Sequence, residues 1–220
     1  MKKTRGINNK GFSLIEVLVA TAVFLLFALG IYGGIKLVFK IVYNSRLRII
    51  ETAVLSEKLE TVRNLPYEDV GIKNGIPSGV LPYSTTTVRN GIDFDIITTV
   101  RNIDDPFDGM ATGTAQVDNA PADYKLVEMS IICQHCAQSN PVTLSTRVSP
   151  RGLEGASDNG SLFIHVFDSQ GLDVKGADVD VTYNGSTTLN IQDTTDKDGM
   201  VKIIDTPTGT QAYDITVTKE

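Results

Sequence analysis

The sequence is poor in the residues from which most catalytic sites are built. It has only two histidines, His135 and His165, and two cysteines, and it has no nucleophile motif and no glycine-rich phosphate loop. Its many aspartates stand in segments with the composition of turns. General acid–base and nucleophilic catalysis need such groups side by side. The sequence therefore predicts a protein that is not an enzyme.

Positive charge is also scarce outside the N-terminal region. The formal net charge is -6; residues 66–150 hold five bases and ten acids, and residues 161–220 hold four bases and ten acids. Nucleic-acid binding requires clustered lysine and arginine that neutralise backbone phosphates. No nucleic-acid partner is expected.

A long uncharged segment lies near the N-terminus, and no Ala-x-Ala cleavage site follows it. Residues 17–35 carry no charge, and with residues 12–15 they reach the roughly 20 residues needed to cross a bilayer. A secretory signal has a shorter apolar core, of about 7 to 15 residues, ahead of its cleavage site. Glu16 stands at the head of this segment, where a carboxylate is costly in lipid and usually has a partner. We expect a retained membrane helix, with cleavage before it, between Gly11 and Phe12.

This segment resembles the class III leader of type IV prepilins and pseudopilins. The matching residues are Lys10-Gly11 and then Phe12-Ser13-Leu14-Ile15-Glu16-Val17-Leu18-Val19-Ala20. The resemblance implies that residues 1–11 are a leader removed by prepilin peptidase and that Phe12 is N-methylated. It further implies that the new Phe12 amine pairs with Glu16 of a neighbouring pilin subunit.

The resemblance also sets the expected location and partners. It implies a single-pass membrane protein whose C-terminal region is extracytoplasmic, and which then moves into a pilus or to the cell surface. Other pilin subunits and the inner-membrane pilus assembly machinery are the implied partners. Flanking charge does not decide the orientation by the positive-inside rule. Four bases precede the segment and four follow it: Lys2, Lys3, Arg5 and Lys10, then Lys36, Lys40, Arg46 and Arg48.

The helix is expected to cover residues 12–65, with a membrane part of about 12–35 and an amphipathic part of about 36–65. Apolar residues recur on one side of the second part, although Glu51 and Lys58 lie in the same arc. Those apolar residues are Leu47, Ile50, Val54, Leu55, Leu59, Val62 and Leu65. Pro66 supplies the stop.

Three glycines, Gly30, Gly33 and Gly34, lie inside the apolar part, where each lowers helix stability by about 1 kcal/mol relative to alanine. They either let a neighbouring helix approach closely, mark a place where the helix extends or melts on assembly, or are simply tolerated in a membrane helix.

Residues 66–150 predict a β-rich head. Residues 80–89 and 92–101 flank Asn90-Gly91, a strong signal for a two-residue hairpin. Residues 124–133 and 142–148 are two further strand candidates. Together they predict a four-stranded antiparallel sheet packed on the upper helix. Residues 53–71 also resemble the helix-to-head junction of minor type IV pilins.

Residues 151–160 have linker composition, and residues 161–220 predict a small β-sandwich. This last part resembles the carboxypeptidase-regulatory-like (transthyretin-like) domain, which is non-catalytic where it occurs in enzymes. The matching pieces are Val166-Phe167-Asp168, Lys175-Gly176-Ala177-Asp178-Val179, Thr195-Asp196-Lys197-Asp198-Gly199 and Pro207-Thr208-Gly209. The predicted fold class is thus α+β, with a long N-terminal transmembrane helix, an antiparallel pilin head and a small all-β domain.

The sequence Cys133-Gln134-His135-Cys136 has three interpretations. Outside the cytoplasm, two cysteines this close in a hairpin form a disulfide more often than not. Free thiols are the second interpretation. Part of a zinc site or a redox pair is the third, although a structural zinc site needs a fourth protein ligand.

Asp104, Asp105 and Asp108 cluster in one loop, and Asp118 and Asp123 stand in the same connection. Calcium takes six to eight oxygen ligands, and such a loop supplies several. The alternative is a solvated turn, because Asp, Pro and Gly are ordinary turn residues. Calcium is the one cofactor that the sequence raises; none is required.

The combined features predict a minor type IV pilin that displays an accessory β-sandwich. Three alternatives remain open: a type II secretion pseudopilin, a pilin-anchored adhesin or binding module, and a membrane-anchored protein that never polymerises.

Overall fold

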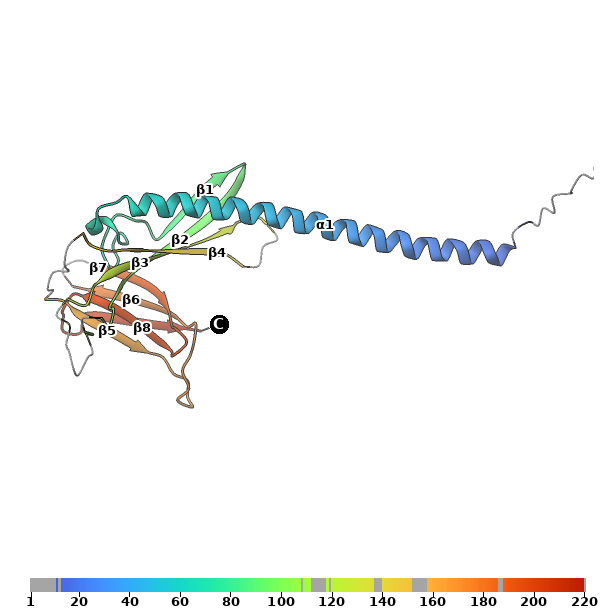
Figure 1. Ribbon diagram of the computed structural model, residues 1–220. Helices are drawn as coiled ribbons and strands as arrows, with labels where there is room; N and C mark the ends of the chain where they lie inside the picture. The colour runs from blue at the N-terminus through green and yellow to red at the C-terminus, as the bar shows by residue number, and fades with distance from the viewer. Residues whose placement is uncertain are drawn as a thin grey trace, which may run out of the picture. The chain divides into compact units, whose positions relative to one another are not determined.

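The structure is a computed structural model, and it describes residues 11, 13–107, 109–111, 118, 120–136, 140–151, 158–185 and 188–219. The chain divides into two compact units, Met1–Arg48 and Ile49–Glu220. The elements are labelled in Figure 1.

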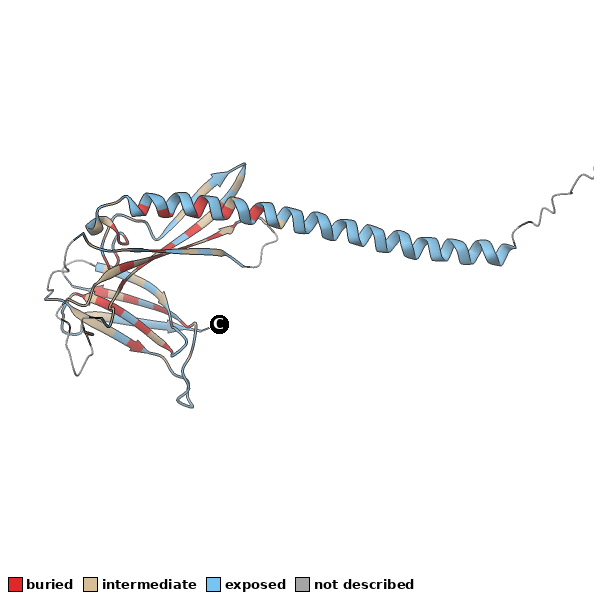
Figure 2. Ribbon diagram, in the orientation of Figure 1, coloured by how far each residue is buried: buried red, intermediate tan, exposed pale blue. Residues whose placement is uncertain are grey.

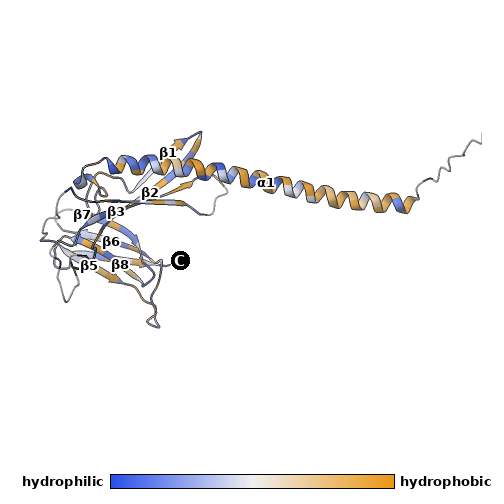
Figure 3. Ribbon diagram, in the orientation of Figure 1, coloured by the Kyte–Doolittle hydropathy of each residue, from blue (hydrophilic) through white to orange (hydrophobic). Residues whose placement is uncertain are grey.

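Helix α1, Leu14–Arg63, dominates the first unit and continues into the second. Ser13 caps its first turn, because Ser13 Oγ accepts the Glu16 backbone N–H at 3.3 Å. The first thirty residues of α1 are exposed (Figure 2) and mostly apolar (Figure 3). Among the described residues, α1 is the one helix long and apolar enough to cross a membrane. The helix runs unbroken through Gly30, Gly33 and Gly34.

The part of α1 in the second unit has one buried side, as its apolar pattern predicts. Val54, Leu55, Leu59 and Val62 are all buried, whereas Lys58 on the predicted arc is exposed. Glu51, also on that arc, is fully buried. The end is tightened by two i→i−3 hydrogen bonds before Pro66, from the backbone N–H groups of residues 64 and 65. A short 3-10 helix, η1 (Tyr67–Asp69), follows.

The head holds the predicted four-stranded antiparallel sheet, in the order β1-β2-β3-β4. Its strands are β1 Ser84–Arg89, β2 Ile92–Ile103, β3 Tyr124–Cys133 and β4 Val142–Val148. The hairpin turn has φ of 54° at Asn90 and 74° at Gly91, which is the pair of positive φ angles that a type I′ turn requires. Along β2 and β3 every second side chain is buried, so the buried side chains lie on one face of the sheet. Buried residues of the two strands lie opposite one another, as Phe94 lies opposite Cys133.

Helix α1 is tied to both outer strands of this sheet. The Arg63 guanidinium donates to Thr146 Oγ1 in β4 at 2.8 Å. Glu57 forms an ion pair with Arg89 at the end of β1. The buried side of α1 and the buried face of the sheet therefore make the core of the head.

Residues 160–218 form two further sheets, which matches the predicted β-rich region. One sheet pairs β5 with β8, and the other has the order β7-β6-β9. The strands are β5 Gly160–His165, β6 Asp178–Asn184, β7 Thr188–Thr194, β8 Met200–Thr206 and β9 Tyr213–Thr218. Their apolar core consists mainly of Ile164, Val179, Val181, Val201 and Ile203.

This apolar core also includes Ile76, a residue of the loop between η1 and β1. The loop contributes a second contact, because Asn74 O accepts the Asn190 backbone N–H of β7 at 2.9 Å. From β2, Asn102 Nδ2 donates to Ile204 O of β8 at 3.2 Å. Within the second unit, head and C-terminal strands thus share a core and hydrogen bonds. Most of the predicted linker, residues 152–157, lies outside the described residues.

Candidate functional site

The N-terminal end of α1 presents Glu16 in the first helical turn. Gly11 is exposed, and Phe12, the predicted new N-terminus, lies outside the described residues. Ser13 and Glu16 have the S-x-x-E spacing of a capping box, and Ser13 Oγ satisfies one N–H that the helix start leaves unpaired. The sequence reasoning missed Ser13 as the cap, although that spacing is a sequence-level signal.

Glu16 lies on an otherwise apolar surface. It borders a shallow groove with Val17, Ala20, Thr21 and Phe24. The Thr21 hydroxyl is satisfied within the helix, because it donates to Val17 O at 2.5 Å and Leu18 O at 3.1 Å. Within the part of the chain that the structure describes, the Glu16 carboxylate has neither an ion pair nor a hydrogen bond. In lipid a charged carboxylate on such a surface is costly unless a cation from outside the surface pairs with it.

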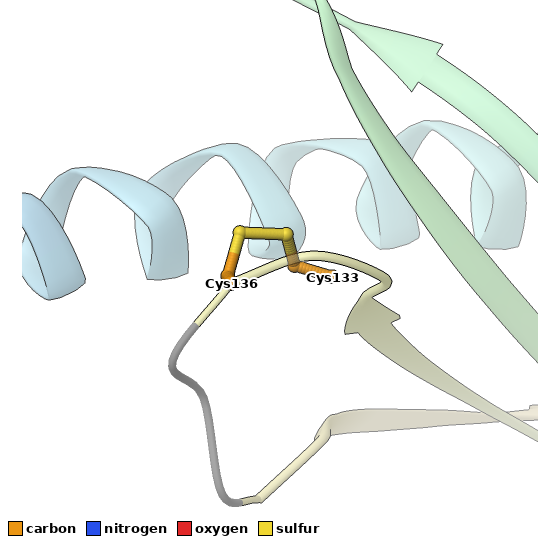
Figure 4. Close-up of a disulfide and its surroundings, with 2 residues drawn as sticks. All are labelled: Cys133 and Cys136. Atoms are coloured by element: carbon orange, nitrogen blue, oxygen red, sulfur yellow. A yellow bond between two sulfur atoms is a disulfide. The ribbon is translucent and has the colours of Figure 1, made fainter.

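Cys133 and Cys136 are joined by a disulfide that closes the end of β3 (Figure 4). Their Cα atoms lie 5.5 Å apart, within the ordinary range for a disulfide. Cys133 is buried opposite Phe94, whereas His135 between the two cysteines is exposed. Sulfurs joined in this way are not thiolate ligands, so the arrangement stabilises the loop and offers no metal site.

The sequence predicted a cluster of Asp104, Asp105 and Asp108, but the carboxylates that the structure brings together are a different set. Oxygens of Asp104, Asp118 and Asp123 lie within 4.8 Å of one another. Asp104 Oδ1 and Asp118 Oδ2 are buried and have no hydrogen-bond partner among the described residues. Asp105 instead accepts the Phe107 N–H at 3.2 Å in its own turn, and Asp108 lies outside the described residues. The three gathered aspartates are the residues that could hold a cation here.

A cleft of about 400 Å³ lies between the head and the C-terminal strands, lined by parts of β2, β7 and β8 and by residues 72–76. At its wall the Arg101 guanidinium lies 3.5 Å from Asp193 Oδ1. Burial raises the pKa of Asp193, and the Arg101 charge opposes this only in part. The pair joins β2 to β7 at the cost of burying a carboxylate.

Lys125 on β3 is a buried lysine that the sequence reasoning did not single out. Burial lowers the pKa of Lys125, and the negative charge of Glu68 opposes this shift. A lysine of lowered pKa is a candidate nucleophile. Here, however, Nζ donates to Tyr67 O at 2.9 Å and lies 4.4 Å from the centre of the Tyr67 ring. These contacts use Lys125 to fix η1 on the sheet.

Comparison with known proteins bears on the N-terminal region alone. The family model described as the prokaryotic N-terminal methylation motif matches residues 7–32. No curated protein and no solved structure gives a significant match. The matched segment contains Gly11, Glu16 and the first turns of α1, so motif and helix together support a type IV pilin or pseudopilin precursor. Such a leader implies processing by prepilin peptidase and assembly with other pilin subunits.

Proposed function

We propose that the protein is a minor type IV pilin, a non-enzymatic structural subunit that carries an accessory β-sandwich. The observation that carries this proposal is the placement of Glu16. It lies in the first turn of α1, inside the methylation motif, at the head of an exposed apolar helix.

The chemistry of assembly follows from that placement. Cleavage after Gly11 creates an amine at Phe12, on the same end of the helix as Glu16. Charges that must enter a low-dielectric layer are stabilised when they pair. A neighbouring subunit's Phe12 amine is the cation that Glu16 would pair with, and burial of the apolar surface along the helix would hold the subunits together.

The size of the head supports low-copy use. Residues 49–220 make one compact unit, and its described residues form three sheets, of which the C-terminal two are additional to the α1-supported head. A bulky head is harder to repeat along a tightly packed rod. The accessory part, which we interpret as a carboxypeptidase-regulatory-like domain, would be displayed on the filament surface or tip.

The test is the intact mass and N-terminal sequence of the protein isolated from cells, followed by its share of purified filaments. We expect a chain that begins at a methylated Phe12 and makes up a small minority of filament subunits. Retention of residues 1–11 would refute the pilin assignment. A dominant share of filament subunits would refute minor use, and exclusive recovery from periplasmic secretion filaments would favour a pseudopilin.

A further inference from the structure

The two sheets of the C-terminal region are unequal in width. β7 and β8 follow one another through a short turn, in which the Asp196 backbone N–H donates to Met200 O at 3.0 Å, so these two strands lie at the same edge of their respective sheets. Beyond β8 lies β5 alone, whereas beyond β7 lie β6 and then β9. Counting from the edge that holds β7 and β8, β9 has no strand opposite it among the described residues.

The inner face of β9 is correspondingly uncovered. Ile215 and Val217 lie opposite Val181 and Val179 of β6 in register, so their side chains point to the same face of the sheet. The two β6 valines are each 1% exposed, but Ile215 is 44% exposed and Val217 is 40% exposed. These two apolar side chains face the place that a third strand of the β5-β8 sheet would occupy.

The edge of β5 that borders this place has backbone groups that no other strand of the described chain uses. Val166 donates its N–H to Gly199 O, on the β8 side. Because successive residues of a strand point their N–H and C=O groups to opposite edges, Phe163 and His165 of β5 direct theirs away from β8. β5 pairs with no strand other than β8 in the described chain.

This edge also lacks the features by which proteins protect an edge strand. Prolines and charged side chains normally block pairing with another chain, and β4 at the edge of the head sheet contains Arg147 and is flanked by Pro141 and Pro150. Residues 160–167 contain no proline, lysine, arginine or acid. An unprotected edge beside an uncovered apolar face is the arrangement that strand addition uses.

We propose that β5 is a docking edge, where an extended segment of another polypeptide adds as a third strand and covers Ile215 and Val217. Alternate residues of that segment would be apolar, because they face β9. The remaining residues would include lysine or arginine, because residues 161–220 hold ten acids and four bases.

A second copy of the same domain does not fit this place by antiparallel pairing of β5 with β5. Such pairing uses a two-fold axis perpendicular to the β5-β8 sheet. It would put the β7-β6-β9 sheets of both copies on the same side of the joined β5-β8 sheets. β9 of each copy would then collide with β6 of the other, since β9 already extends one strand beyond β5. A single isolated strand avoids this collision.

The test uses the full chain, purified in detergent, and a fluorescent ten-residue peptide of alternating valine with lysine or threonine. The first variant is His165→Pro, which removes an N–H from the free edge only; His165→Ala is the matched control. The second is Ile215→Lys, on the uncovered face, with Thr216→Lys on the other face of β9 as its control. Thermal unfolding of each variant monitors folding.

We expect saturable peptide binding that His165→Pro and Ile215→Lys each weaken by about tenfold or more, since strand addition depends on main-chain hydrogen bonds and on the side-chain pocket. The two controls should stay within about twofold, because they spare both contacts. Glutamate in place of the peptide lysines should also weaken binding. Absence of binding, or equal binding by all variants, would overturn the proposal. Self-association that His165→Pro abolishes would overturn the choice of occupant.

Discussion

At the scale of single residues, the start of α1 assigns two physical tasks to neighbouring side chains. Ser13 caps the helix through the Glu16 backbone N–H, while the Glu16 carboxylate is left on the apolar surface. The two tasks can be separated by substitution, because the cap uses the backbone of Glu16 and assembly would use its side chain.

Glu16→Ala should leave cleavage after Gly11 largely intact and reduce incorporation into filaments, because the neighbouring Phe12 amine would lose its counter-charge. Immunoblots of whole cells and of sheared filaments measure both quantities. Ser13→Ala is the control: it costs the helix about 1 kcal/mol through loss of the cap but keeps the carboxylate. Normal filament incorporation of Glu16→Ala would contradict the assembly role.

Asp193 predicts a specific pH dependence of stability. Burial raises the pKa of Asp193 above its usual 3.8, despite Arg101. The folded protein then holds a proton on this carboxyl at a pH where the unfolded chain has lost it. The free energy of unfolding should therefore fall as pH rises from about 4 through the raised pKa.

Asp193→Asn should remove this fall, so its stability should change less with pH over that range than that of the unsubstituted protein. Urea unfolding at a series of pH values between about 4 and 7 measures the difference. Asp180→Asn, on an exposed position of β6, is the control and should keep the original slope. An unchanged slope in Asp193→Asn would show that Arg101 compensates the buried charge fully.

At the scale of elements, local sequence patterns predicted the structure correctly where the residues of a single segment determine its conformation. Asn90-Gly91 specifies the turn of the β1-β2 hairpin, and the bounds predicted for β3, β4 and β9 agree with the structure. Partners distant in sequence were not predictable in this way. No residue close to Asp193 in the sequence indicates that Asp193 pairs with Arg101. The grouping of Asp104 with Asp118 and Asp123 depends on how the connection between β2 and β3 folds back on itself.

The Cys133–Cys136 disulfide should contribute modestly to stability, because it closes a very short loop. Loop-closure entropy for so few residues corresponds to about 2 kcal/mol. The double substitution Cys133→Ser and Cys136→Ser should therefore lower the free energy of unfolding by about that amount, as measured by urea unfolding. Added zinc should not alter the free energy of unfolding of the unsubstituted protein or of the double variant. A zinc-dependent increase in stability of the reduced protein would instead favour the metal interpretation.

The acidic loop gives a test of the calcium hypothesis. If Asp104, Asp118 and Asp123 hold calcium, millimolar calcium should raise the melting temperature, and a chelator should reverse the rise. Asp104→Asn together with Asp118→Asn should abolish the response, whereas Asp168→Asn in a distant turn should not. No response from calcium would leave these aspartates as turn residues, and an equal response from magnesium would indicate a cation site that does not select calcium.

At the scale of the whole molecule, the C-terminal strands depend on a residue far away in sequence. Ile76 belongs to the loop after η1, yet it is 8% exposed in the core formed by β5, β6 and β8. The hydrogen bonds from Asn190 to Asn74 and from Asn102 to Ile204 reinforce this connection. A composition-based boundary at residues 151–160 does not account for these contacts, because they depend on packing and leave no local signal in the sequence.

Ile76→Ala should therefore destabilise the head and the C-terminal strands together. Removing a buried isoleucine typically costs about 2 to 5 kcal/mol, and we expect the loss to reach amides of β2 as well as β6. Hydrogen exchange of the full chain in detergent measures protection strand by strand. Ile97→Ala, at an exposed position of β2, is the control and should change protection little. If Ile76→Ala reduced protection in the strands β5 to β9 alone, those strands would unfold independently, as a separate domain on a linker does.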